Sequence, residues 1–346
     1  MMRGKGKKKK GLLSRLGSLL ALSIVLFFIL DILIVLLLPP TFQGEEKQVL
    51  IPKGSTFREV VQALDEKGLL RSPTAFYLMA RVSGVAGSVQ AGEYELNTAM
   101  TPAVILHKLV SGDVVKYRIT IPEGYTVRQI ASRLAELGII TEQEEFLRAA
   151  FSSDFDAMLG IDGESVEGYL FPDTYLFSKA VAPQEVIRTM VGKFKRVYTP
   201  EFSQRAAELG LTDREVVTLA SIIEKETGLS EERTLVSAVF HNRLKRGMSL
   251  ASDPTVIYGI KDFDGNLRKR DLETKTPYNT YIIQGLPPGP IANPGRASIE
   301  AALYPAQVNY LYFVSRNDGS HHFSATLREH NAAVRRYQRG GRRAIQ

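Results

Sequence analysis

The sequence predicts an α+β protein that is attached to a membrane by a single N-terminal transmembrane helix. Three observations support this prediction: a basic tail before a long apolar segment, a repeated strand–helix unit, and a C-terminal half in which helices alternate with loops rich in Pro, Gly, Asn and Tyr. A chain of 346 residues can form two or three domains with cores of their own. It contains no cysteine, which excludes disulfides, thiolate metal sites and cysteine nucleophiles.

The excess positive charge of the chain lies in its N-terminal tail. The formal net charge is +7, and residues 1–15 hold seven Lys and Arg residues and no acidic residue. The remainder of the chain therefore carries 37 basic and 37 acidic residues. Because nucleic-acid-binding domains concentrate basic residues on a folded face, this distribution argues against a nucleic-acid partner.

Residues 17–38 form the predicted membrane helix. This segment contains one charged residue, Asp31, and is followed directly by Pro39. At ~1.5 Å per residue it extends about 33 Å, enough for a hydrocarbon core of roughly 30 Å. The basic residues before it place the tail at 1–16 in the cytoplasm and the rest of the chain on the extracytoplasmic side of the plasma (inner) membrane. A cleaved signal peptide is the alternative, but its apolar core is usually shorter and no small-x-small site precedes Pro39.

Residues 45–160 contain an internal repeat with a period of 70 residues. The sequence IPKGSTFR at 51–58 returns as IPEGYTVR at 121–128. Each copy predicts a short strand, a Pro-x-Gly turn, a Thr-capped amphipathic helix and a glycine stop. Between the copies, a strand is predicted at 91–96 and a helix at 102–110. These modules resemble LysM-type glycan-binding domains, and the region is either a glycan-binding site or a structural spacer.

Residues 161–346 are predicted to form a mixed α/β domain whose sheet includes the strand 310–314. Its loops are dense in Tyr and Asn, which suit the stacking and hydrogen bonding that a sugar ring requires. Ordinary turn chemistry would explain any single loop equally well. Considered together, the loops make this half the expected location of a substrate site.

The helix predicted at 213–227 carries the strongest candidate for a catalytic side chain. Thr212 and Glu215 form a capping box at its start. At 100° per residue Glu224 lies within the apolar stripe, where desolvation would raise its pKa and keep a proton available for general acid catalysis. Glu226 lies at the other edge of the stripe. A partly buried Glu paired with an Arg or Lys is the alternative, and the helical pattern alone does not decide.

Motifs within and around this helix resemble those of the YceG-like endolytic transglycosylases. The helix itself carries the sequence ASIIEKET at 220–227. The other motifs occur in the order expected for the family: EGYLFPDTY at 167–175, DPTVIYG at 253–259, YNTY at 278–281, GLPPGPIANPG at 285–295, YLYFV at 310–314 and GSHHFSATLREHN at 319–331. With the apolar segment and the repeat, the resemblance covers nearly the whole chain.

The resemblance implies a lytic transglycosylase, a lyase that acts without cofactor or metal. It would cleave the β-1,4 bond between N-acetylmuramic acid and N-acetylglucosamine in nascent peptidoglycan strands and leave a 1,6-anhydro-muramoyl end. The catalytic glutamate of the family matches Glu224, which would protonate the glycosidic oxygen and then accept the proton of the muramoyl C6 hydroxyl. Because that hydroxyl belongs to the substrate, a second carboxylate is dispensable. Glu226 is the second candidate.

Five further residues are expected near the sugar, where they would orient it or stabilise the oxocarbenium-like centre: Tyr278, Asn279, Tyr281, Asn293 and His321. Stabilisation of the loops is the alternative role for each of them. The histidines of the chain show no HExxH pattern, so no metal site is expected. The resemblance also implies that the enzyme works beside penicillin-binding glycan synthases and terminates the elongation of new strands.

Two other functions remain open from the sequence. A hydrolytic muramidase would need a second carboxylate, for which Asp253 and Glu329 are the candidates. A membrane-anchored peptidoglycan-binding scaffold would need no catalysis, and Glu224→Gln would leave its glycan binding intact. An anhydro end, a reducing end or an absence of cleavage distinguishes the three functions.

Overall fold

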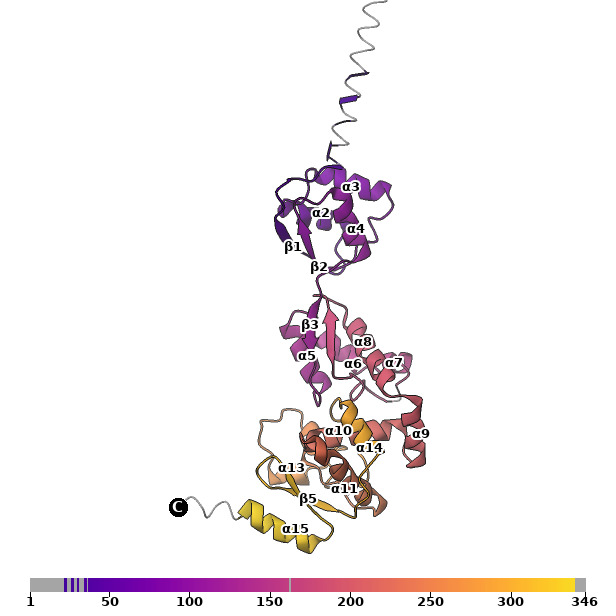
Figure 1. The fold of residues 1–346 in the computed structure, drawn as a ribbon, viewed down its shortest axis with the longest axis vertical. Coiled ribbons are helices and arrows are strands. Elements are labelled where there is room, and N and C mark those ends of the chain that lie inside the picture. The colour runs from indigo at the N-terminus through magenta and orange to yellow at the C-terminus, as the bar shows by residue number, and fades with distance from the viewer. Residues whose placement is uncertain are drawn as a thin grey trace, which may run out of the picture. The chain divides into compact units, whose positions relative to one another are not determined.

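The computed structural model describes residues 37–161 and 163–339, together with 22, 23, 26, 27, 30, 34 and 35. The predicted tail at 1–16, and most of the predicted membrane helix at 17–38 with Asp31, lie outside the described residues. Among the residues that are described, no helix is both long enough and apolar enough to span a membrane. The described chain is α+β, as predicted, with short two-stranded sheets among many helices (Figure 1).

The chain divides into two compact units. The first comprises the described residues up to Tyr117 together with Ser178–Val181, and the second comprises Arg118–Phe177 and the chain from Ala182 onward. This division differs from the boundary predicted near residue 160, because the second copy of the repeat belongs to the second unit. There, for example, the backbone N–H of Gly124 donates to the carbonyl of Asn293 at 2.9 Å.

The first unit is a β–α–α–β module followed by one helix. Strand β1 (Glu46–Ile51) pairs antiparallel with β2 (Gly92–Asn97). Helices α2 (Phe57–Glu66) and α3 (Pro73–Val82) come between the two strands in the sequence, and α4 (Pro102–Ser111) follows them. One core joins all five elements through side chains that include Val49, Val61, Leu64, Phe76, Tyr94, Leu96, Ile105 and Leu109.

Both copies of the sequence repeat begin with the same local structure. Helix α2 starts after Thr56 and helix α5 (Val127–Glu136) after Thr126, and each threonine forms a capping box with the third helical residue. Gly68 and Gly138 follow these two helices with φ of 69° and 67°, a left-handed conformation that glycine adopts without a steric penalty.

The second unit consists mainly of helices, with two small sheets. Strand β3 (Tyr117–Thr120) pairs with β4 (Thr174–Phe177), and β5 (Tyr312–Ser315) pairs antiparallel with β6 (His321–Ser324). The longer helices of this unit after α5 are α6 (Gln143–Ala150), α8 (Pro183–Val197), α9 (Pro200–Glu208), α10 (Asp213–Glu226), α11 (Arg233–Lys245), α14 (Arg296–Leu303) and α15 (Leu327–Val334). The shorter ones are α7 (Ser153–Met158), α12 (Asp253–Tyr258) and α13 (Lys269–Glu273), with a 3₁₀ turn at Ser230–Glu232 and a π-helical turn at Arg335–Arg339.

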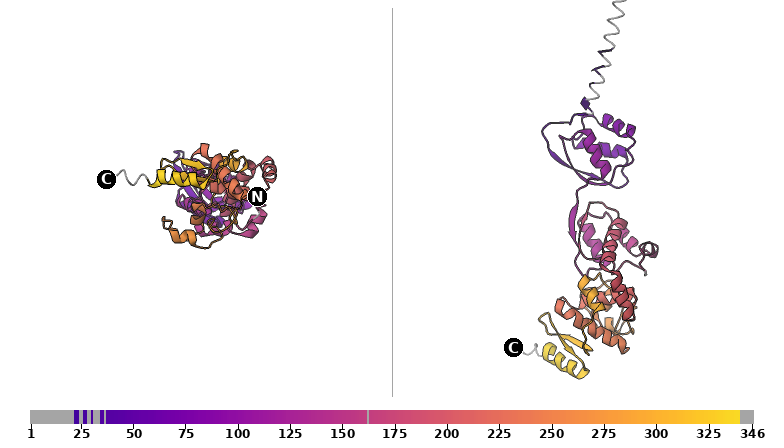
Figure 2. Two further views of the ribbon diagram at one scale, coloured as in Figure 1. Left: turned by 90° about the horizontal axis from the view of Figure 1, so that it is seen from below. Right: turned by 45° about the vertical axis from the view of Figure 1, so that its right-hand side comes forward.

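Helix α10 is the central helix of the second unit. It packs against α9, α11, α12 and α14, and in the views of Figure 1 and Figure 2 the red and orange helices gather around it. Every residue from Val216 to Ile223 is buried. A helix that is buried on all sides has no single apolar stripe, so the positions of Glu224 and Glu226 on a helical wheel do not distinguish their environments.

Candidate active site

Glu224, in the last turn of α10, is held by groups of the protein itself. Its side chain is 7% exposed, and one carboxylate oxygen accepts a hydrogen bond from the backbone N–H of Gly295 at 3.0 Å. The other oxygen lies 3.6 Å from the guanidinium of Arg233, which is also 3.7 Å from Glu123. Burial raises the pKa of Glu123, and the nearby carboxyl of Glu224 raises it too. Both oxygens of Glu224 therefore connect α10 to α11 and to the start of α14.

Glu226, the last residue of α10, lies in a different environment. The hydroxyl of Ser252 donates to its Oε1 atom. The pKa of Glu226 is raised to about 7, mainly by burial and also by the charge of Asp253, against the lowering effects of Ser252, His321 and Arg243. Its place at the C-terminal end of a helix disfavours a carboxylate as well. A carboxyl with this pKa keeps a proton to donate near neutral pH, as a general acid requires.

A cavity of about 350 Å³ adjoins Glu226. This Glu226 cavity is within the size range of small-molecule sites. Its lining combines aromatic, cationic and carboxylate side chains, which are the groups that bind and polarise a sugar. The residues that line it besides Glu226 are Arg243, Ala251, Asp253, Tyr281, Phe313, Val314, Ser315, His321, His330, Val334 and Gln338.

Two of the residues predicted to lie near the sugar line this cavity. The hydroxyl of Tyr281 donates to Asp253 Oδ1 at 2.6 Å, and the Tyr281 side chain remains partly exposed. His321 lies with its Nδ1 atom 2.7 Å from Glu232, which also accepts from the His321 backbone N–H at 2.8 Å. Glu232 therefore fixes the orientation of the imidazole and leaves Nε2 as the ring nitrogen that can face a ligand.

The backbone before Ser252 is unusual. Ala251 has φ of 47°, which lies in the left-handed region that non-glycine residues rarely adopt. Its N–H donates to the carbonyl of Thr280 at 3.0 Å, and the N–H of Ser252 donates to the Thr280 hydroxyl at 3.0 Å. This pair of bonds holds Ser252 beneath Glu226, and backbone strain of this kind is often found next to functional sites.

Two of the predicted sugar contacts are instead internal supports of the loops. Asn279 is fully buried, and its amide donates to three backbone carbonyls within Asp271–Thr274 at 2.8–3.3 Å. Asn293 is also fully buried, donates to Glu167 at 3.0 Å and accepts from the N–H of Leu170 at 2.8 Å. Both amides are enclosed by the protein in this structure, which favours the loop-stabilising alternative; their contact with substrate stays a prediction.

Tyr278 lies away from the lining of the Glu226 cavity. Its ring centroid is 4.8 Å from that of Tyr258, and burial raises its pKa. Glu329, one of the two carboxylates considered for a muramidase, caps α15 through the N–H of Thr326. Asp253, the other, is in the Glu226 cavity. Of the residues that the structure describes, no group of three or more His, Asp or Glu side chains is arranged to hold a metal ion.

Sequence reasoning did not identify Ser252, Glu232 and Arg243. Ser252 directly precedes the DPTVIYG motif, which is the signal that could have indicated it. Glu232 and His321 are 89 residues apart in the sequence, and no local pattern predicts their contact. Arg243 donates to the carbonyls of Leu250 and Leu311 at 2.6 and 2.7 Å, so it supports the loop beneath the cavity as well as lining it.

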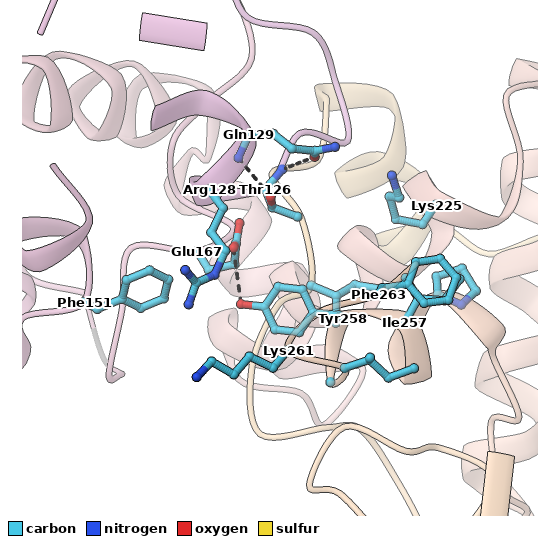
Figure 3. A pocket seen from close by; sticks show the side chains of 14 residues that line it. Thr126, Arg128, Gln129, Phe151, Glu167, Lys225, Ile257, Tyr258, Lys261 and Phe263 are labelled. Carbon is cyan, nitrogen blue, oxygen red and sulfur yellow. Dashed lines mark hydrogen bonds between the residues drawn. The ribbon is translucent and has the colours of Figure 1, made fainter. Parts of the chain in front are cut away.

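A second and larger cavity, of about 820 Å³, is lined by Lys225 of α10 and by residues of α5, α12 and neighbouring loops (Figure 3). Glu167, one of its lining residues, is 2% exposed and accepts hydrogen bonds from the N–H of Val127 and from the side chains of Asn293 and Tyr258. Burial raises the pKa of Glu167 to about 8, although these bonds act in the opposite direction.

The fold and the site together define an α+β protein with two largely buried carboxyls at the end of its central helix. The chain belongs to the YceG-like family, whose sequence profile matches residues 49–336. This match confirms the resemblance of the motifs.

Named relatives agree with that family. The endolytic murein transglycosylase of Bacillus subtilis is 34% identical over 305 residues, which are 83% of this chain and 83% of that protein. The endolytic murein transglycosylase of Streptococcus pneumoniae serotype 2 is 29% identical over 315 residues, which are 82% of this chain and 57% of that protein. The crystal structure of the yceG-like protein lmo1499 from Listeria monocytogenes shares 33% sequence identity and a TM-score of 0.58, over 83% of this chain and 98% of that one.

Proposed function

We propose that this protein is an endolytic murein transglycosylase. It cleaves the β-1,4 bond between N-acetylmuramic acid and N-acetylglucosamine within peptidoglycan strands and leaves 1,6-anhydro-muramoyl ends. The relationship to the Bacillus subtilis enzyme over 83% of both chains supports the activity. The observation that carries the mechanism is the buried carboxyl at the end of α10, whose pKa is raised to about 7 beside a cavity.

We assign the general acid–base role to Glu226 rather than to Glu224. One oxygen of Glu224 accepts the N–H of Gly295, the other lies 3.6 Å from the Arg233 guanidinium, and Glu224 is not among the residues that line the Glu226 cavity. Glu226 lines the cavity and has one oxygen bound to Ser252, which leaves its Oε2 atom for the substrate. The candidate from the family motif therefore moves by two residues along the same helix.

The reaction needs one carboxyl in two protonation states. Protonated Glu226 donates its proton to the glycosidic oxygen as the bond from that oxygen to muramoyl C1 breaks. The carboxylate so formed, stabilised by the Ser252 hydroxyl, then accepts the proton of the C6 hydroxyl while that oxygen bonds to C1. Glu226 ends protonated, as it began, and no water is consumed. The charge of Asp253, held by Tyr281, stabilises the positive oxocarbenium-like centre between the two events.

We also propose where in the cell the protein acts and what its first unit does. The segment 17–38 would anchor the chain in the plasma membrane with the two compact units outside, near penicillin-binding glycan synthases and the strands that they elongate. Cleavage there would terminate elongation. The β–α–α–β order and antiparallel strands of the first unit support its interpretation as a LysM-like module that binds glycan.

Mass spectrometry of the products from uncrosslinked glycan strands tests the activity and its residue together. Wild-type protein is expected to give anhydro-terminated fragments from the interior of strands. Glu226→Gln is expected to reduce the rate by at least ~10³-fold, because an amide has no proton to donate. Glu224→Gln keeps a side chain of the same shape and is expected to retain most of the activity. The opposite ranking of the two variants would return the catalytic role to Glu224.

Hydrolysis is the second candidate function, because Asp253 lies in the same cavity as Glu226. A carboxylate in that place can activate water or form a covalent intermediate. Reaction in ¹⁸O-labelled water separates the two chemistries. Transglycosylation leaves the products unlabelled, whereas hydrolysis incorporates one ¹⁸O atom at each new reducing end.

A further inference from the structure

The larger cavity, defined by its lining from Thr126 to Ile291, is not used by the proposed reaction. Its volume of about 820 Å³ is more than twice the 350 Å³ of the Glu226 cavity. Three cationic side chains line it: Arg128 from α5, Lys225 from α10, and Lys261 from the loop after α12. In Figure 3 the charged ends of Arg128 and Lys261 point to one side of the cavity, and Lys225 lies on another.

These three cations are available to an anionic ligand. None of them belongs to an ion pair among the described residues. Arg128 stacks 5.6 Å above the ring of Phe151, which holds its planar group in place while its N–H donors stay available. Lys225 makes one hydrogen bond to the carbonyl of Gly124, at 3.3 Å, and an ammonium has three donors.

The lining adds no opposing charge at the surface of the cavity. Glu167 is its one carboxyl residue, and both of its oxygens are occupied by donors of the protein. The rest of the wall is largely apolar, with Ile257, Phe263 and Ile291 among its residues. A ligand that fits this combination carries carboxylates and small aliphatic side chains on one short, flexible chain.

Neighbouring residues of the chain line the two cavities at two places. Lys225 lines the larger cavity and Glu226 the smaller one, and likewise Pro254 lines the larger cavity and Asp253 the smaller one. Consecutive Cα atoms lie ~3.8 Å apart, so the walls of the two cavities are adjacent along the backbone at these two places. An extended peptide of four residues reaches up to about 14 Å. A peptide attached to a sugar at Glu226 can therefore extend into the larger cavity.

We propose that the larger cavity binds the carboxylate-bearing peptide of a muramoyl residue next to the bond that is cleaved. This inference rests on the proposed murein substrate, whose muramoyl groups carry short peptides with free carboxylates and alanine side chains. Arg128 and Lys261 bind the carboxylates, and the apolar wall accepts the alanine methyl groups. The cavity thereby makes peptide-bearing strands better substrates than strands without peptides.

The test compares kcat/KM on two preparations of the same strands, with their peptides and after enzymatic removal of the peptides. The full-length protein in detergent is used as wild type and as the double variant Arg128→Gln, Lys261→Gln. Its matched control is Arg270→Gln, Lys275→Gln, which removes the same charge from exposed positions outside both cavities. Binding of a soluble muramoyl peptide is measured by calorimetry on the same three proteins.

The cavity variant is expected to lose ~10-fold or more in kcat/KM on peptide-bearing strands, because it loses charge-assisted hydrogen bonds to carboxylates. Its activity on strands without peptides stays unchanged, and its affinity for the soluble peptide falls in parallel. The control variant matches wild type in all three measurements. An equal loss on both strand preparations, or no loss on either, overturns the proposal.

The same experiments distinguish a failure of the proposed transglycosylase activity from a failure of the peptide-binding proposal. If wild type cleaves neither preparation, the transglycosylase assignment fails. Calorimetry then still decides the cavity, since binding of the soluble peptide that depends on Arg128 and Lys261 requires no catalysis. Absence of peptide binding by the wild-type protein counts against the cavity in either case.

Discussion

At the scale of single residues, the catalytic assignment depends on what surrounds two glutamates that are separated by one lysine. Both are largely buried at the end of α10, so burial alone does not separate them. Their partners do: Glu224 contacts Arg233 and the N–H of Gly295, whereas Glu226 has a serine donor, a neighbouring carboxylate and an open cavity. A general acid needs a proton near neutral pH and access to substrate, and the surroundings of Glu226 provide both.

The pH dependence of kcat/KM follows from the pKa of Glu226. The acid must be protonated when substrate binds, so the rate is expected to fall as pH rises above about 7. Asp253→Asn removes a negative charge that raises this pKa, and the descending limb of the profile should therefore move to lower pH. Kinetics between pH 5 and 9 measure both effects. A limb that stays in place in the Asp253 variant would mean that another group controls it.

Glu167 gives a second prediction, for stability. Its pKa rises from a usual value of 4.5 to about 8 on folding, so between these values the folded protein holds a proton that the unfolded chain releases. This group therefore stabilises the fold less and less as pH rises from 4.5 to 8. Glu167→Gln cannot titrate. As pH rises, its free energy of unfolding should therefore increase relative to that of wild type, by up to ~1.4 kcal/mol for each unit of the pKa shift.

Urea unfolding of wild type and of the Glu167 variant at pH 5 and pH 8 measures that difference. The other titrating groups are shared, so the change in the gap between the two proteins isolates Glu167. Glu164→Gln, at an exposed position, is the matched control and should keep a constant gap from wild type. A gap for Glu167→Gln that does not change between the two pH values would show that this carboxyl has the same pKa in both states.

At the scale of elements, the loops of the second unit are positioned by close packing against α10. Gly168 has φ of 89°, and a Cβ atom there would lie 2.5 Å from Pro290 and 2.9 Å from Val217 of α10. Gly285 has a similar φ of 81° but nothing within 4 Å of such an atom. The two loops that contain Gly168 and Pro290 therefore meet where only a residue without a side chain fits.

Alanine at these two glycines separates backbone strain from packing. Gly285→Ala should lose about 1–2 kcal/mol in the free energy of unfolding, the cost of a left-handed L-residue. Gly168→Ala should lose roughly 1–3 kcal/mol more, because its methyl group also overlaps Pro290 and Val217. Denaturant unfolding, analysed with the same slope m for each protein, measures the two losses in the free energy of unfolding. Equal losses in the two variants would show that the loops separate at little cost.

Elements with local signals could be predicted from the sequence, and contacts between distant segments could not. The caps at Thr56 and Thr126, the capping box at Thr212 and the strand at 310–314 follow from neighbouring residues, and the structure has all of them, with the strand at Tyr312–Ser315. The site is assembled from α10, the loop at Ser252 and β6, so its side chains meet only through the tertiary fold. The helical wheel does not choose between Glu224 and Glu226, because it assumes one buried face and α10 is buried on all sides.

At the scale of the whole molecule, the excess positive charge and the buried side chains lie in different parts of the chain. The basic excess lies in residues 1–15, while each compact unit has buried side chains of its own. The first unit is tied together from its first residues, since Arg71 donates to the carbonyl of Pro39 at 2.9 Å. The Thr41 N–H donates to the carbonyl of Thr98 at 3.3 Å. Pro39 and Thr41 therefore belong to the packed part of the first unit.

If the proposed anchor is correct, deletion of residues 1–38 should release an active protein from the membrane, because every residue of the Glu226 cavity lies in the second unit. The full-length chain is expected to sediment with membranes and to resist extraction by high salt, because a 22-residue apolar segment partitions into lipid independently of ionic strength. The shortened chain should be soluble, with kcat/KM on soluble strands within ~2-fold of the full-length protein, since the residues of the Glu226 cavity all lie beyond position 225. Fractionation and kinetics on the two proteins measure both quantities. A full-length chain that high salt removes would show that the basic tail holds it by charge alone, and a shortened chain without activity would show that the segment contributes to the fold.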